Sequence, residues 1–198
     1  MVDRHLAVGK EIGLAAPGRI PIDLHWRFGE RAYPFELPDN NLWSRSQTID
    51  LKAGQVQTLG NEELLLYLCF HGTKHYWLRL LWLSDVARLL QSTSFDWPAV
   101  VRLSKQTGSE RCLSLALFLV RDLLACELPG LPRSAGSRLD GALAAEVVRF
   151  LAVPPNTLRR TRFRLRARER RRDKARFLLG RALRLGEYGW ETLTTGGG

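Results

Sequence analysis

The chain has 198 residues, of which 45% are hydrophobic, and it contains six tryptophans. A chain of this size and composition can bury a substantial core, which excludes a fully disordered protein. Its longest apolar run, 64–70, is far shorter than the roughly 20 residues that a membrane-spanning helix needs. Because the first residues also lack the apolar core of a signal peptide, we expect a cytoplasmic protein without a membrane span.

The net charge of +10 is concentrated in one late segment. Between Leu158 and Arg184 there are thirteen basic and two acidic residues, whereas the rest of the chain has 17 basic and 18 acidic residues. Any attraction to an acidic partner is therefore expected from this segment alone. The three cysteines, Cys69, Cys112 and Cys126, lie in apolar patterns without paired spacing, which predicts reduced core residues.

The first 60 residues are expected to be β-rich. Residues 20–28, IPIDLHWRF, alternate between apolar and polar side chains, as in a half-buried strand whose other face carries Asp23 and His25. A carboxylate on such a strand can serve a metal site or a proton transfer, and the alternative is a solvated strand face. Residues 48–51 and 55–59 flank Lys52-Ala53-Gly54, which predicts a hairpin.

From Asn61 onward the pattern is helical. Asn61, Asp96 and Ser109 are suitable helix caps, and Gly108 is a suitable helix end. The sequence predicts helices at 62–75, 77–91, 97–107, 110–126, 139–151 and 157–185, the last of them strongly basic. The expected fold class is mainly α with a small N-terminal β portion (α+β). The expected divisions are a β portion (1–60), a helical domain (61–153), a basic helix (154–190) and a disordered tail (191–198).

The most informative stretch is 71–90, HGTKHYWLRLLWLSDVARLL. Its apolar residues recur at three-and-four spacing, which predicts one buried stripe. The stripe comprises Leu78, Leu81, Trp82, Val86, Leu89 and Leu90. Trp82 is thus expected to be a structural core residue. Asp85 lies within the same segment, and we expect it to pair with Arg79, Arg88 or a histidine, because an unpaired buried carboxylate is costly.

His71 and His75 lie four residues apart, so they share one helical face and could ligate a metal. The residues between them hold no glutamate, so the zinc-hydrolase pattern His-Glu-x-x-His is absent. Lys74 favours an anion such as phosphate, because an ammonium repels a cation and attracts an oxyanion. The alternative is a pair of histidines hydrogen-bonded at a helix end, and the spacing alone does not decide between these.

The arginine run from Arg159 to Arg172 could bind nucleic acid through phosphates. It has little interleaved aromatic character beyond Phe163, and no groove-reading motif accompanies it. A solvated helix face or a docking surface for an acidic partner is an equally good interpretation.

Three segments together resemble the uncharacterised bacterial nucleotidyltransferase family, which is related to the polymerase-β superfamily. They are IDLHWRF at 22–28, LLLYLCFHGTKHYWLRLLWLSDVARLL at 64–90 and FDWPAV at 95–100. The resemblance implies transfer of a nucleoside monophosphate from a nucleoside triphosphate to an unknown acceptor with magnesium, in a fold whose β portion is a remnant of the superfamily sheet. It implies that Asp23 is the catalytic, metal-binding carboxylate. The implied substrate-binding residues are His25, His71, Lys74, His75 and Arg79.

The sequence departs from the superfamily pattern before Asp23. A Gly-Ser turn and an Asp-x-Asp strand are expected there, and the residues that precede Pro21 contain neither. We therefore expect an N-terminally truncated member that is inactive as this polypeptide alone. The alternatives are a non-catalytic binding or scaffold module, and a nucleic-acid-associated protein that acts through Arg159–Arg172.

Overall fold

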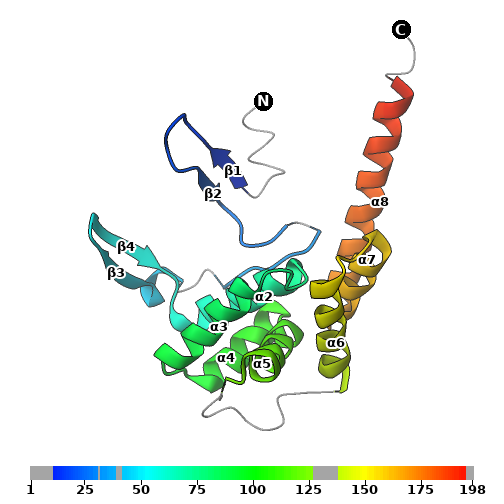
Figure 1. Ribbon diagram of the computed structural model, residues 1–198. Helices are drawn as coiled ribbons and strands as arrows, with labels where there is room; N and C mark the ends of the chain where they lie inside the picture. Colours follow the sequence, from blue (N-terminus) through cyan, green and yellow to red (C-terminus); the bar gives the residue numbers. More distant parts are fainter. Residues whose placement is uncertain (1–10, 31, 39–41, 127–137, 195–198) are drawn as a thin grey trace. The chain divides into compact units, whose positions relative to one another are not determined.

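The computed structural model describes residues 11–30, 32–38, 42–126 and 138–194 (Figure 1). It is mainly helical with a small N-terminal β portion, which confirms the predicted α+β class. The chain divides into two compact units, one formed by Met1–Glu36 with Arg170–Gly198 and the other by Leu37–Glu169. The four functional divisions expected from the sequence remain a prediction.

The first unit contains an antiparallel hairpin of β1 (Glu11–Leu14) and β2 (Ile22–His25). Strand β2 confirms the predicted strand, although it ends at His25 and its partner β1 was not expected. The predicted burial of one face is wrong, because Ile22 is 62% exposed and Leu24 is 56% exposed. A hairpin is a single layer, so its apolar face is buried only where another element covers it.

Helix α8 (Arg171–Thr194) belongs to the same unit. Its buried Phe177 packs edge-on against Tyr33, with ring centroids 5.7 Å apart. One turn later, a side chain at Gly180 would overlap Ala32, so the glycine permits a close approach of the two segments. One face of α8 therefore packs against residues 32–33.

The second unit begins with a 3-10 turn, η1 (Trp43–Arg45), and the hairpin of β3 (Gln47–Leu51) and β4 (Gly54–Thr58). The hairpin confirms the prediction, and Gly54, with φ 141°, follows the two-residue turn. On one face, Gln55 Nε2 donates to Asp50 Oδ1 at 2.8 Å and Gln57 Nε2 donates to Thr48 Oγ1 at 2.8 Å. Such cross-strand pairs hold the register of an otherwise exposed hairpin.

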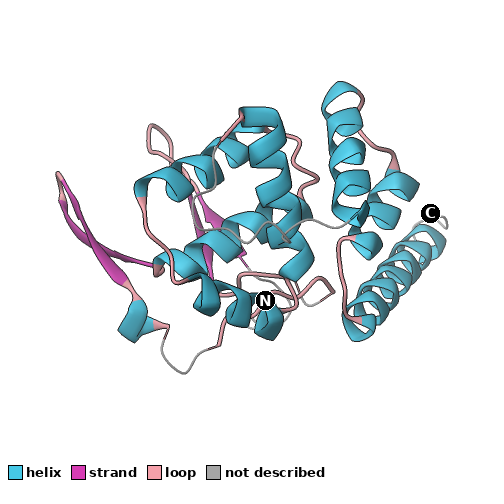
Figure 2. Ribbon diagram, turned by 90° about the horizontal axis from the view of Figure 1, so that it is seen from below, coloured by secondary structure: helices cyan, strands magenta, loops and turns pink. Residues whose placement is uncertain are grey.

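Among the described residues of this unit, six α-helices follow the hairpin. They are α2 (Asn61–Lys74), α3 (Leu80–Ser92), α4 (Trp97–Thr107), α5 (Glu110–Leu124), α6 (Arg138–Ala152) and α7 (Thr157–Arg166). Figure 2 draws the helices of the chain in cyan, seen from below. Helix α5 packs against α2, α3, α4 and α6, and it buries Leu115, Ala116 and Leu119 almost completely. The core of the unit therefore forms around α5.

Three of the four predicted helix signals hold and one does not. Ser109 is the N-cap residue of α5, although its side chain makes no capping hydrogen bond. The Asp96 carboxylate accepts from the Ala99 N–H at 3.0 Å, and Gly108 ends α4 in the left-handed conformation with φ 66°. At α2, however, Gly60 is the N-cap, and Asn61 is already the first helical residue. The buried Glu63 in that first turn forms an ion pair with the exposed Arg45, which joins η1 to α2.

Helices α2 and α3 are separated by a tight turn in which Tyr76 and Trp77 both have positive φ, 61° and 55°. Trp77 is fully buried, and its backbone N–H donates to the Gly72 carbonyl at 2.8 Å. A side chain at Gly72 would overlap carbons of the Trp77 indole, so a glycine inside α2 makes room for that ring. The turn explains why α3 begins at Leu80 rather than at the predicted residue 77.

The delayed start of α3 also shifts its buried face. The residues of α3 that are buried are Leu83, Val86, Ala87 and Leu90. Leu81, which was predicted to be buried, is 65% exposed, and Trp82 is half-buried. The predicted stripe is therefore correct only at Val86 and Leu90.

The predicted single basic helix at 157–185 is wrong, because the chain forms α7 and then α8, with a break at 167–170. The break delivers Arg168 to the interior of the second unit, where it is 1% exposed and donates to the Gly108 carbonyl at 3.0 Å. Arg111 Nη1 donates to the carbonyls of Arg166 and Arg168, at 2.6 and 3.0 Å. These bonds satisfy carbonyls that a continuous helix would have used itself.

Helix α8 continues to Thr194, and the remainder of the predicted tail, 195–198, lies outside the described residues. Residues 127–137 lie outside them as well. Within the described part of the chain, no helix combines the length and the apolar character that crossing a bilayer requires.

Candidate functional site

Asp23 and His25 lie on β2 in the first unit, and both side chains are exposed. The register pairs His25 with Glu11 and Asp23 with Gly13, so all three polar side chains share one face of the hairpin. His25 Nδ1 lies 3.2 Å from Glu11 Oε2, which orients the imidazole against β1. The sequence argument missed Glu11 because β1 was not predicted.

His71 and His75 lie in the second unit and form a ring cluster with Trp82 of α3. The ring centroids are 4.7 Å apart between the two imidazoles, 5.3 Å between His71 and Trp82, and 5.4 Å between His75 and Trp82. All three residues are half-buried. The turn at Tyr76 and Trp77 folds α3 back so that its first turn, which holds Trp82, meets the end of α2.

Two further side chains extend this ring cluster. The Arg79 guanidinium lies 5.7 Å from the centroid of the Trp82 ring, and Arg79 is exposed. The Tyr67 ring lies 5.9 Å from His71. Tyr67 was not predicted, but its i, i+4 spacing with His71 on a helix could have identified it. The ring cluster, defined as Tyr67, His71, His75, Arg79 and Trp82, therefore contains three of the predicted substrate-binding residues.

Lys74 is not part of this cluster. It is only 5% exposed, and its carbonyl accepts from Arg164 Nη2 at 3.1 Å. A residue this deeply placed contributes its alkyl chain to the interior. The prediction that Lys74 accompanies the histidines in binding an anion remains a prediction.

The predicted ion pair of Asp85 is not formed with Arg79, Arg88 or a histidine of the described chain. The physical reason is that Asp85 is only half-buried, so water can solvate its carboxylate and no buried charge needs a partner. Trp82 is a core residue only in part, because one portion of its ring remains accessible.

Magnesium, which the family resemblance implies, is a hard cation that binds through oxygen ligands. At sites that act on nucleotides it is usually held by one or two carboxylates together with water and phosphate oxygens of the substrate. No group of three or more histidine, cysteine, aspartate or glutamate side chains in the described ranges is arranged to hold a metal ion. Asp23 contributes one exposed carboxylate, and its neighbour His25 contacts Glu11.

The cysteines are equally unsuited to nucleophilic or metal chemistry. Burial raises the pKa of Cys69 well above its ordinary value and that of Cys112 to about 11, an effect that Arg168 only partly opposes. Both thiols are protonated at neutral pH, and the thiolate is the reactive form. This confirms the prediction that they are reduced core residues.

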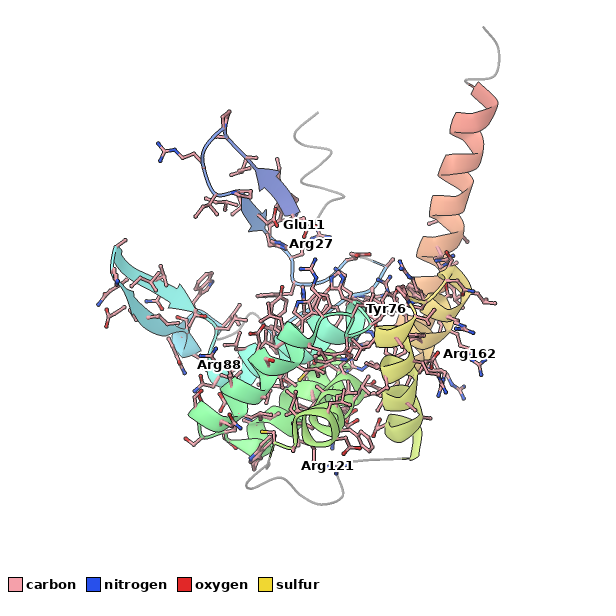
Figure 3. The ribbon with its side chains drawn as sticks, viewed as in Figure 1. Glu11, Arg27, Tyr76, Arg88, Arg121 and Arg162 are labelled. Carbon is pink, nitrogen blue, oxygen red and sulfur yellow. The ribbon has the colours of Figure 1, made fainter. Side chains whose placement is uncertain are left out.

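Four of the nine arginines between Arg159 and Arg172 make contacts inside the second unit. The Arg160 and Arg164 guanidiniums lie 5.6 and 5.1 Å from the Tyr76 ring centroid, and Figure 3 shows Tyr76 near α7. Arg168 lies 5.0 Å from the Phe70 ring, and Arg166 Nη1 bonds to Glu146 Oε2 at 2.7 Å. These contacts attach α7 to α2 and α6 and reduce the number of arginines that can meet an acidic partner.

Comparison with known proteins gives one match. A family model described as "uncharacterised nucleotidyltransferase" matches residues 3–125, well over half of the chain. No curated protein and no solved structure matches. The matched region includes β2 and the whole ring cluster. The chain therefore belongs to the uncharacterised nucleotidyltransferase family.

Proposed function

We propose that this protein binds a nucleoside triphosphate at the ring cluster as part of a nucleotidyl transfer reaction. The observation that carries the proposal is that α2 and α3 bring His71, His75 and Trp82 into mutual contact, with the exposed Arg79 beside them. This cluster lies in the region that matches the nucleotidyltransferase family.

The chemistry of the cluster suits a nucleotide. Aromatic side chains that stack on a base contribute about 1–3 kcal/mol per base. A guanidinium offers several donors in a planar fork that matches phosphate oxygens. In the proposal, the half-buried rings contact the base and Arg79, which is exposed, contacts the phosphates.

We assign Asp23 to the transfer step, as the family resemblance implies, and His25 to the substrate side of the same strand face. Magnesium enters the proposal as the counter-ion of the nucleotide. Since no cluster of metal-binding side chains joins Asp23 among the described residues, we expect this chain to bind nucleotide but to transfer it very slowly. The proposal names no particular acceptor for the nucleoside monophosphate. We propose that the protein acts in the cytoplasm.

The test separates binding from transfer. The full chain is titrated with each of the four Mg-NTPs by calorimetry, and saturable heat with at least one of them is expected. Arg79→Gln should weaken this binding by about tenfold or more, because one charge-assisted hydrogen bond is worth about 1.5–3 kcal/mol. Arg88→Gln is the matched control, since Arg88 is an exposed arginine on α3, the helix that Arg79 precedes, and lies outside the cluster.

Two results would contradict the proposal. An absence of heat with all four Mg-NTPs would remove nucleotide binding. Equal affinities of wild type and Arg79→Gln would show that a nucleotide binds elsewhere on the chain. Transfer is measured independently, by incubating the protein with γ-labelled NTP and following the release of labelled pyrophosphate, and rapid release would refute the expected slow turnover.

A further inference from the structure

Helix α8 presents an apolar stripe on its outer face, opposite the face that packs on Tyr33. Leu178, Leu179 and Leu183 are 49%, 64% and 70% exposed. With the exposed Ala175 and Ala182 they follow the spacing i, i+3, i+4, i+7, i+8, which places them along one side of a helix. We call these five residues the outer stripe. The opposite side of the helix holds Asp173 and Phe177, which are buried, and Gly180, which lies against Ala32 of the first unit.

Basic side chains surround the outer stripe. At 100° per residue, Lys174 and Arg181 lie along one border and Arg176 lies along the other, with Arg171 and Arg172 at the beginning of the helix. The segment 171–183 contains a single acidic residue, Asp173, which is 4% exposed. Its Oδ1 atom lies 3.7 Å from Nε of Arg172. The exposed surface of this segment is thus apolar in the middle and positive at its edges, over roughly 20 Å of helix.

From this arrangement we infer that the outer face of α8 binds an anionic lipid surface, with the helix lying in the plane of the headgroups. This inference is independent of the proposed nucleotide site. In helices of this kind, leucine side chains enter the boundary between headgroups and acyl chains, while arginine and lysine reach outward to the phosphates. The positive borders complement the negative surface potential that anionic lipids create.

The shape and composition of the stripe favour a lipid surface over the other acidic partners. Nucleic acid is attracted by the cations alone and gives exposed leucines no apolar environment to enter. An acidic protein would need a groove that encloses a convex helix face, whereas a membrane surface accommodates such a face directly. Because no described helix has the character of a bilayer span, the expected attachment is superficial and reversible.

The test is sedimentation of the full chain with vesicles of phosphatidylcholine, with and without phosphatidylglycerol. We expect binding to the vesicles that contain phosphatidylglycerol, weaker binding at high salt and little binding to phosphatidylcholine alone. Replacing Leu179 and Leu183 together by glutamate should reduce binding by about tenfold or more, because both apolar insertion and charge attraction are lost. Arg176→Gln should reduce it by about fivefold.

Leu158→Glu is the matched control, because Leu158 is an exposed leucine in the basic helix α7 and lies outside the outer stripe. Its binding to phosphatidylglycerol vesicles should remain close to that of wild type. All variants change exposed residues, and circular dichroism verifies that each one is folded. The inference is overturned if wild type does not sediment with either kind of vesicle. It is equally overturned if both vesicles bind alike, if the stripe variant binds as well as wild type, or if Leu158→Glu loses as much binding as the stripe variant.

Discussion

Gly72→Ala should destabilise the protein, although it replaces a poor helix former by the best one. Gly72 lies inside α2, and on helix propensity alone alanine would add about 1 kcal/mol of stability there. The opposing effect is steric, because the new methyl group would overlap three carbons of the Trp77 indole. Trp77 is completely buried, so its ring cannot move aside into solvent.

The structure sets the size of the loss. Overpacking a core usually costs about 1–3 kcal/mol, and removing the packing of a buried tryptophan costs about 3–5 kcal/mol. We take the upper range, because the overlap involves rigid ring atoms rather than the end of a flexible side chain. After subtraction of the gain in helix propensity, the free energy of unfolding should fall by about 2–4 kcal/mol.

Urea unfolding followed by circular dichroism measures this change. With a slope of about 2 kcal/mol per molar urea, a loss of 2 kcal/mol lowers the unfolding midpoint by about 1 M. Gly141→Ala is the matched control, because Gly141 is also helical but its added methyl would lie 3.8 Å from Phe118, which is ordinary contact. The control should be neutral or slightly stabilising. A Gly72→Ala protein as stable as wild type would refute the assigned packing of Trp77 on α2.

Two further predictions concern the helix cap at Asp96 and the buried thiol of Cys112. Asp96→Ala removes the acceptor of the Ala99 N–H, so the free energy of unfolding measured in urea should fall by about 1 kcal/mol. Asp96→Asn keeps an acceptor and should lower it by only about a few tenths of a kcal/mol. Equal losses of stability in the two variants would argue against capping. Because burial raises the pKa of Cys112 to about 11 in the folded protein, the unfolded thiol loses its proton first as the pH rises. The contribution of Cys112 to stability should therefore be constant below about pH 8.5 and fall by about 3 kcal/mol up to pH 11. Burial of Cys69 adds to the decline of the wild type, and Cys112→Ala should show a shallower decline than the wild type.

Local signals predicted most of the helices of this protein correctly. Helix α4 begins after Asp96 and ends before Gly108, as predicted. Such caps can be predicted because they act through backbone groups only a few residues away. The hairpin at 47–58 followed from a short turn between two alternating runs. The i, i+4 spacing of His71 and His75 was enough to place their rings on one face of α2, 4.7 Å apart.

The sequence alone therefore determined the α+β class, the main helix boundaries and the family of this protein. Only the tertiary structure decided how α2 and α3 meet, because two residues with positive φ and a buried Trp77 redirect the chain after His75. That turn adds Trp82 and Arg79 to the histidines and leaves Leu81 exposed. Likewise, the burial of Arg168 on Phe70 divides the basic segment into α7 and α8. In each case the outcome depends on contacts between residues that are distant in sequence, and helical periodicity carries no information about such contacts.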